Sequence, residues 1–123
     1  MIDAAQKTAA GLNLRVSIAV VDSRGDVIAL ARMPGAGIIT PDTAIGKAMT
    51  SAVFGQPSAS FAQTGATVTF QLINDLMSGR LRFIQGAVPI VRDGVVVGAI
   101  AASGATSQQD EDVAKSGLAA AVR

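Results

Sequence analysis

Two basic residues stand where a charged side chain could do chemistry. Arg32 ends a predicted strand and leads into the loop that begins at Met33. Functional groups concentrate at such strand-to-loop positions, and a guanidinium there can hold a carboxylate or phosphate through two parallel hydrogen bonds. A surface arginine paired with a nearby acid would explain Arg32 equally well, so both interpretations stay open.

Lys47 lies in the middle of a predicted helix, among Ala, Ile, Gly and Met residues. Lysine is rarely buried without a partner or a purpose. Burial lowers the pKa of a lysine, which would allow Lys47 to act as a base or to hold an anion. The alternative is a lysine that reaches solvent from an exposed face. We predict Lys47 as the catalytic candidate and as a ligand-binding residue.

Two phenylalanines and one turn supply weaker candidates. Phe54 and Phe61 flank a Gly and a Pro, and they line an apolar pocket or anchor the core. Ser103 begins the turn before the last predicted helix, and the free N–H groups of a helix N-terminus favour anions. A plain strand-to-helix connection, with Gly104 selected for its backbone freedom, explains the same turn.

Composition excludes several classes of function. The 123 residues include no His and no Cys, which excludes imidazole catalysis, disulfides, and imidazole or thiolate metal sites, and no metal site is predicted. The net charge is +1 and the only aromatic residues are four Phe, so the chain lacks the basic stripe and stacking rings of nucleic-acid-binding proteins. No apolar run approaches the roughly 20 residues of a membrane span, and the first residues do not resemble a secretory signal. We expect a cytoplasmic protein.

The first third of the chain predicts a helix and a hairpin that position Arg32. Residues 2–11 are rich in Ala and predict a short helix. The β-branched run Arg15–Asp22 predicts a strand, and Asp26–Arg32 predicts the strand that returns from it. Asp22 precedes a tight turn, which its side chain is expected to cap.

The middle third predicts the helix that carries Lys47. Thr40 is expected to cap this helix, with Pro41 in its first turn. We predict a helical turn at Ser58–Gln63, a helix at Thr67–Met77 and a short strand at Leu81–Gln85.

The last third predicts a second hairpin and a closing helix. Ala87–Arg92 and Val95–Ala102 pair around an Asp-Gly turn. Ser107 is expected to cap the last helix with Asp110 three residues later. The predicted fold is a single α/β (α+β) domain over residues 1–123, with one antiparallel sheet of about five strands and flanking helices.

Two strands lack the alternation of a sheet with one wet face. Val16–Val21 and Val95–Ala102 are apolar at nearly every position, so both of their faces are expected to be covered. A second copy of the chain is the simplest cover for the face that three short helices leave open. The alternative is that the loop at 55–66 folds over it.

Several segments together resemble the haem-degrading-domain family, the GlcG/HbpS-like proteins, whose related domains also occur at the C-terminus of PduO-type cobalamin adenosyltransferases. The similarity runs from about residue 14 to the end, and its most specific part is the glycine-and-acid pattern from 93 to 111. The segments that carry it are Ile18–Gly25, Arg32–Ala36, Ala44–Ala52, Gly86–Ile90, Asp93–Ile100 and Ser103–Glu111.

This resemblance implies a compact antiparallel domain of the profilin-like or PAS-like kind. It also implies homo-oligomers from dimers to octamers, and some members bind haem. Haem-binding members are usually discussed with a His near the iron, whereas this chain lacks His, Cys and Tyr and retains only Met, with Lys as a poor substitute. Haem is therefore expected to dock, if at all, through its ring and propionates.

Two functional hypotheses from different classes follow. The first is a protein that binds a haem-like molecule or a small aromatic or organic acid in a pocket between subunits. The second is a cofactor-free lyase or isomerase acting on a small catabolic acid, with Lys47 or an acidic residue as the proton carrier. The predicted ligand-binding residues are Arg32, Met33, Lys47, Phe54, Phe61, Gln85, Gly86 and Ser103.

Overall fold

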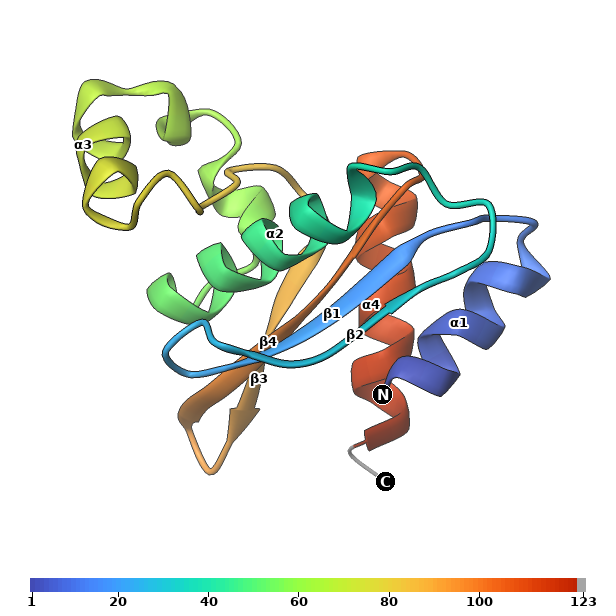
Figure 1. Cartoon of the computed structure of the whole chain (residues 1–123). Coiled ribbons are helices and arrows are strands. Elements are labelled where there is room, and N and C mark those ends of the chain that lie inside the picture. Colours follow the sequence, from blue (N-terminus) through green and yellow to red (C-terminus); the bar gives the residue numbers. More distant parts are fainter. Residues whose placement is uncertain (122–123) are drawn as a thin grey trace.

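A four-stranded antiparallel sheet forms the centre of the molecule (Figure 1). The computed structural model describes residues 1–121. The strand order is β2-β1-β4-β3, so the two hairpins meet along the β1–β4 pair. The strands are β1 (Ser17–Asp22), β2 (Val27–Arg32), β3 (Ala87–Arg92) and β4 (Val95–Ser103).

Both hairpins form as predicted, because short-range signals fix their turns. The side chain of Asp22 accepts hydrogen bonds from the backbone N–H groups of Arg24 and Asp26, at 2.9 and 3.1 Å. In the second turn Asp93 and Gly94 both have positive φ, of 52° and 76°. Two successive left-handed residues match the twist of the flanking strands.

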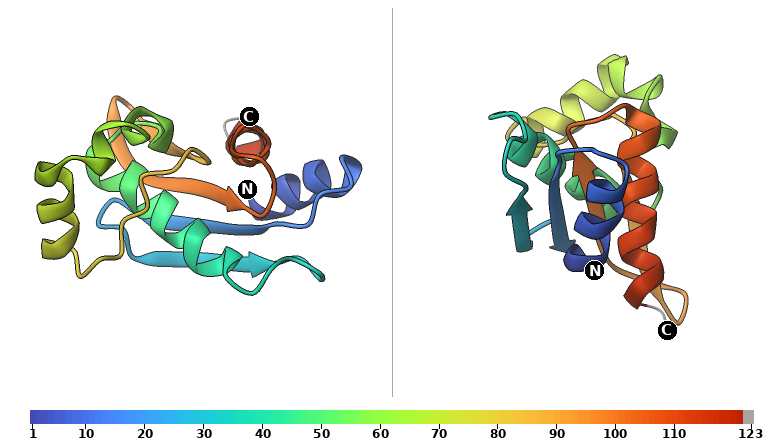
Figure 2. Two further views of the ribbon diagram at one scale, coloured as in Figure 1. Left: turned by 90° about the horizontal axis from the view of Figure 1, so that it is seen from above. Right: turned by 90° about the vertical axis from the view of Figure 1, so that its right-hand side faces the viewer.

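Helices cover both faces of the sheet (Figure 2). Helices α1 (Ile2–Gly11) and α4 (Ser107–Ala121) pack together on one face, and α2 (Thr40–Phe54) crosses the other. The α2 face is built almost entirely from alanines, which allow the helix to lie close to the strands. They are Ala44, Ala48 and Ala52 of the helix and Ala19, Ala87, Ala99 and Ala101 of the strands.

Helix α2 covers the face of the sheet for which a second copy of the chain was expected. Strands β1 and β4 are covered on their second face by α2 of the same chain, and not by a partner or by the loop at 55–66. The helix succeeds because its small side chains bring it close to the strands. Many of the apolar residues that stay exposed lie on the edge strand β2, in the loop that follows it, on α3 (Val68–Leu76) and near the tip of the second hairpin.

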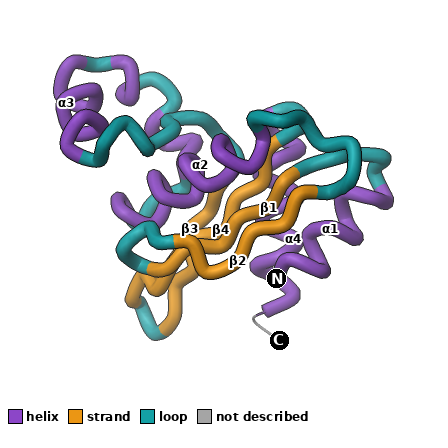
Figure 3. The backbone as a smooth tube through the Cα atoms, in the orientation of Figure 1, coloured by secondary structure: helices purple, strands orange, loops and turns teal. Residues whose placement is uncertain are grey.

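A separate segment stands off from the sheet between α2 and β3 (Figure 3). It contains two 3₁₀ turns, at Ser58–Phe61 and Thr64–Ala66, followed by α3 (Val68–Leu76). The strand predicted at Leu81–Gln85 is wrong, since this stretch pairs with no other strand. Its backbone bonds go to helices: the N–H of Leu81 donates to the side chain of Asn74, and that of Arg82 donates to Thr50.

Two of the predicted helix caps are also wrong. The helix α2 begins at Thr40, whose hydroxyl donates to the carbonyl of Gly37 and lies 2.9 Å from the hydroxyl of Ser17. Before α4, a reciprocal capping box joins Thr106 and Gln109 in place of Ser107 and Asp110. No helix within residues 1–121 has the length and apolar character needed to cross a membrane.

Candidate functional site

A buried ion pair joins α2 to the start of α4. The ammonium of Lys47 lies 3.0 Å from the carboxylate of Asp110, and both side chains are only 3% exposed. The same ammonium donates to the backbone carbonyl of Ala102, at 3.2 Å. Lys47 is therefore buried with a partner, 63 residues away in the sequence.

Asp110 is a residue whose role the sequence analysis missed. Because Thr106 and Gln109 cap the helix, Asp110 is free to turn inward, where its second oxygen accepts the N–H of Ala105 at 2.9 Å. Burial raises the pKa of the Asp110 carboxyl above its ordinary value, although the charge of Lys47 opposes this rise. The Thr-x-x-Gln capping signature at 106–109 was the available signal that Asp110 is not a cap.

Gly86 closes the surroundings of the ion pair. Its φ is +146°, and a Cβ at this position would lie 2.8 Å from the ammonium of Lys47. The neighbouring Gln85 donates its side-chain amide to the carboxylate of Glu111, at 2.8 Å. The structure thus brings four of the predicted residues to one end of the sheet: Lys47, Gln85, Gly86 and the buried Ser103. The described contacts of Lys47 and Gln85 join α2 and the loop before β3 to the start of α4.

Phe54 and Phe61 lie apart from that group. They belong to a cluster that also contains Phe70 and Phe83, with neighbouring ring centroids between 4.8 and 5.6 Å apart. Rings at these separations and tilts attract one another. The cluster contains all four phenylalanines of the chain and fastens the segment around α3 to the end of α2.

Arg32 lies in a polar row that crosses three strands. Ser17 of β1 pairs with Arg32 of β2 on one side and with Ser103 of β4 on the other. Residues directly opposite one another share a face of the sheet, and the contact of Ser17 with Thr40 identifies this face as the one under α2. Arg32 itself, on the edge strand, is exposed.

Exposed apolar residues lie on the same strand as Arg32 and in the loop that follows it. Leu30 lies two residues earlier on the same face and is exposed. The loop between β2 and α2 adds Ile38, which is 90% exposed, and Ile39. A cation beside exposed aliphatic groups is the arrangement that recognises an apolar molecule bearing an acid group.

Met33 lies on the other face of the sheet from Arg32. It packs against the core beneath α1 and α4. Together with Pro34 it lines two shallow hollows beside α1, of about 390 and 290 Å³. Arg32 and Met33 therefore do not converge on one ligand.

The residues present do not supply a ligand for haem iron near Arg32. The chain has no His, Cys or Tyr, and among its methionines Met33 packs on the opposite face and Met49 is a buried residue of α2. Residues 1–121 also contain no cluster of three or more carboxylates that could hold a metal ion.

The chain is similar to one protein family and to several known proteins. A family model described as "Haem degrading protein HbpS-like" matches residues 1–119. Protein GlcG of Escherichia coli is 34% identical over 84% of this chain and 75% of its own length. The corrinoid adenosyltransferase PduO of Salmonella typhimurium is 28% identical over 95% of the chain, which spans only 35% of PduO. The crystal structure of the PduOC:Heme complex superposes with a TM-score of 0.85 at 27% identity, covering 97% of this chain and 87% of that one.

Proposed function

Because the chain belongs to the HbpS-like family of haem degrading proteins, we propose that it binds a small apolar molecule carrying an acid group. The ligand is a haem-like tetrapyrrole or a small aromatic or organic acid. The observation that carries this proposal is that Arg32 is exposed at the end of β2, with exposed Leu30 on the same face of the sheet and exposed Ile38 and Ile39 in the loop that follows. The haem complex of a protein with the same fold supports a tetrapyrrole as one member of this ligand class.

Arg32 binds the acid group in this proposal. Arg32 is the last residue of the edge strand β2, and the strand fixes the backbone that carries its guanidinium. The acid accepts two parallel hydrogen bonds while the apolar part of the ligand covers Leu30 and Ile38. Ser17 and Ser103 continue the polar row behind Arg32 under α2.

The enzymatic alternative has less support. Lys47 would have to exchange a proton with a substrate, yet its ammonium is buried and bonded to Asp110 and to the carbonyl of Ala102. A proton carrier needs to come within hydrogen-bonding distance of the atom that it serves. The contacts of Lys47 favour a role in joining α2 to α4.

The proposal is tested by titrating tag-free protein with haemin and with metal-free protoporphyrin IX. We expect affinities within about threefold of each other, because the chain offers no ligand for the iron near Arg32. We expect Arg32→Gln to weaken both by about tenfold or more, the usual effect of losing a charge-assisted hydrogen bond. Arg24→Gln, in the β1–β2 turn, is the matched control and should bind normally.

Three results would contradict this proposal. The first is equal affinity of the Arg32→Gln and Arg24→Gln variants. The second is haemin binding far tighter than protoporphyrin IX, which would place a coordinating residue at the iron. The third is no saturable binding of either porphyrin or of 1-naphthoate, an aromatic acid of smaller size.

A second copy of the chain is also part of this proposal. Helix α3 carries a candidate interface, since Val68, Leu72 and Leu76 are 71, 59 and 86% exposed and lie four residues apart. Such an aliphatic stripe on a surface helix is typical of a face that is covered by another protein.

We expect light scattering after gel filtration to give a solution mass that is a multiple of the mass of one chain. Leu72→Glu introduces a charge into the stripe and should lower this mass. Gln71→Glu adds the same charge one position away, outside the stripe, and should not change it. A monomeric wild-type protein, or an unchanged mass for Leu72→Glu, would refute α3 as the interface.

A further inference from the structure

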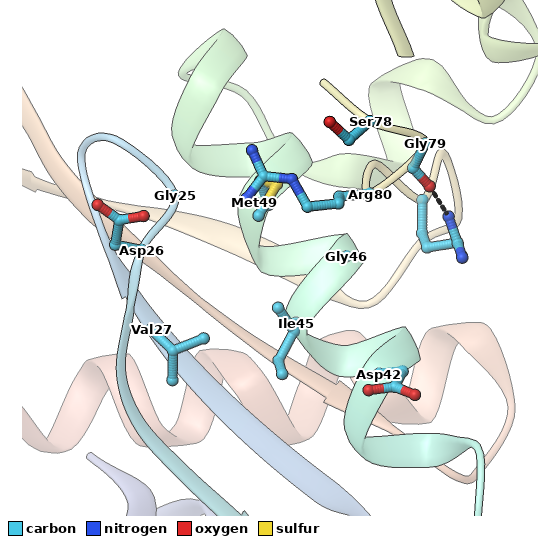
Figure 4. Close-up of a pocket in the computed structure, with 11 residues that line it drawn as sticks. Gly25, Asp26, Val27, Asp42, Ile45, Gly46, Met49, Ser78, Gly79 and Arg80 are labelled. Atoms are coloured by element: carbon cyan, nitrogen blue, oxygen red, sulfur yellow. Dashed lines mark hydrogen bonds between the residues drawn. The ribbon is translucent and has the colours of Figure 1, made fainter. Parts of the chain in front are cut away.

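A hollow of about 500 Å³ lies beside α2, away from the polar row at Arg32 (Figure 4). Three segments enclose it: the β1–β2 turn at Gly25–Val27, the middle of α2, and the loop at 78–82 that follows α3. Its volume falls in the range of small-molecule sites. None of its residues belongs to the surface proposed above for the acid ligand.

The loop that closes the hollow is seated firmly on α2. The N–H of Arg82 donates to the carbonyl of Gly46 at 3.2 Å, and the hydroxyl of Thr50 donates to the carbonyl of Arg82 at 3.1 Å. Gly46 permits this approach, because a Cβ there would lie 2.8 Å from the carbonyl oxygen of Arg80. The wall that carries Arg80 is therefore built into the fold.

Arg80 presents its guanidinium to the hollow. Its Nε donates to the carbonyl of Met77 at 2.9 Å, which orients the side chain. Figure 4 shows the guanidinium extending over Met49 toward the side on which Asp26 lies. Within residues 1–121 the ion pairs are Lys47–Asp110 and Lys115–Glu111, so neither Arg80 nor Asp26 is neutralised by a described neighbour.

The floor between these two charges is apolar. Ile45 and Met49 of α2 form it, and Val27 lies beside Asp26 on the opposite wall (Figure 4). Asp42 adds a second carboxylate at the N-terminal end of α2, and Arg82 a second guanidinium, part of which is used by the carbonyls of Gly79 and Leu81. Opposite charges on separate walls, with aliphatic side chains between them, match a ligand that has the same pattern.

We propose that this hollow binds a small zwitterion, with its carboxylate on Arg80, its ammonium on Asp26 and its methylene chain over Ile45 and Met49. Each charged end replaces its hydration with a charge-assisted hydrogen bond. A molecule with one charged end leaves the opposite wall without a partner and binds more weakly.

The probes are three ω-amino acids of increasing length: β-alanine, 4-aminobutyrate and 6-aminohexanoate. Hexanoate and hexylamine serve as comparators with a single charge. Each is titrated into the ¹⁵N-labelled full chain and followed by amide chemical shifts. We expect at least one of the amino acids to bind about tenfold more tightly than both comparators. The amides that shift should be those of the three segments that line the hollow, at 25–27, 42–49 and 78–82.

Two variants assign the two ends of the ligand. Arg80→Gln should remove about tenfold of the amino acid affinity and leave that of hexylamine unchanged. Asp26→Asn should have the same effect on the amino acid and leave hexanoate unchanged. Arg92→Gln and Asp93→Asn, in the second hairpin and outside the lining of the hollow, are matched controls and should leave every affinity unchanged.

The inference is wrong if hexanoate or hexylamine binds as tightly as all three amino acids, since one wall would then play no part. It is also wrong if no amino acid gives a saturable shift, or if the shifts map outside these three segments. An unchanged amide spectrum of each unliganded variant elsewhere in the chain separates loss of the site from loss of the fold. The porphyrin titration remains independent, because it depends on Arg32.

Discussion

Replacing Lys47 with methionine should destabilise the fold by about 3–5 kcal/mol at neutral pH. The substitution preserves the length of the aliphatic stem but leaves the carboxylate of Asp110 buried without its counter-charge. The other carboxylate oxygen of Asp110 keeps its hydrogen bond from the N–H of Ala105, but this bond is too weak to compensate for the lost charge of Lys47. Urea unfolding followed by far-ultraviolet circular dichroism measures the loss.

The loss of stability in Lys47→Met should become larger as the pH rises. Burial already raises the pKa of Asp110, and removal of the Lys47 charge removes the main influence that opposes this rise. The folded variant then holds a proton at Asp110 more tightly than the unfolded chain does. Its stability relative to wild type should therefore be greatest below the unfolded pKa of an aspartate and fall as pH rises through the raised folded pKa.

The double variant Lys47→Met with Asp110→Asn provides the control. It removes both charges, while the introduced amide side chain keeps an oxygen for the N–H of Ala105, so most of the lost stability should return. A single variant within about 1 kcal/mol of wild type at neutral pH would show that the pair contributes little. A stability that rises with pH relative to wild type would contradict the raised pKa of Asp110.

Gly98→Ala should cost about 3 kcal/mol, at the upper end of the range for overpacking in a core. Gly98 pairs with Ile90 of β3 and with Asp22 of β1, in the interior of the sheet. A Cβ there would collide with the carbonyl oxygen of Val21, and a backbone atom between two paired strands cannot move aside. The effect comes from this close approach and not from backbone conformation.

Gly11→Ala is the matched control for Gly98→Ala. Gly11 ends α1, and a Cβ there would meet no atom within 4 Å. This substitution should be neutral or slightly stabilising, since alanine is the better helix former. Thermal unfolding of both variants separates the two effects. Equal melting temperatures would mean that the sheet can adjust at Gly98.

The sequence predicts this fold best where the signals are local. Asp22 caps the turn of the first hairpin with its own side chain, and Asp93–Gly94 adopts the positive φ values that the second turn needs. Both hairpins form as expected. Leu81–Gln85 has the composition of a strand, but its backbone groups are bonded to α2 and α3. A local sequence pattern cannot reveal that helices distant in the sequence take the hydrogen bonds that a neighbouring strand would otherwise make.

The surroundings of the candidate residues could be predicted only in part, because they depend on register and on distant partners. Lys47 stands out among apolar neighbours, yet its partner Asp110 lies on another helix and looked like a cap. Arg32 and Ser103 share a row only because β1 pairs with both of their strands. Arg32 and Met33 are adjacent in the sequence but lie on opposite faces, which the alternation of a strand explains.

The confinement of every aromatic ring to one cluster has a practical consequence for spectroscopy. The chain has no Trp or Tyr, and its four Phe all lie where the α3 segment meets α2. Near-ultraviolet signals therefore report on the attachment of that segment and say nothing of the sheet. The same absence leaves the protein nearly transparent at 280 nm, so the ultraviolet absorption of a bound aromatic acid such as 1-naphthoate can be followed with little background from the polypeptide.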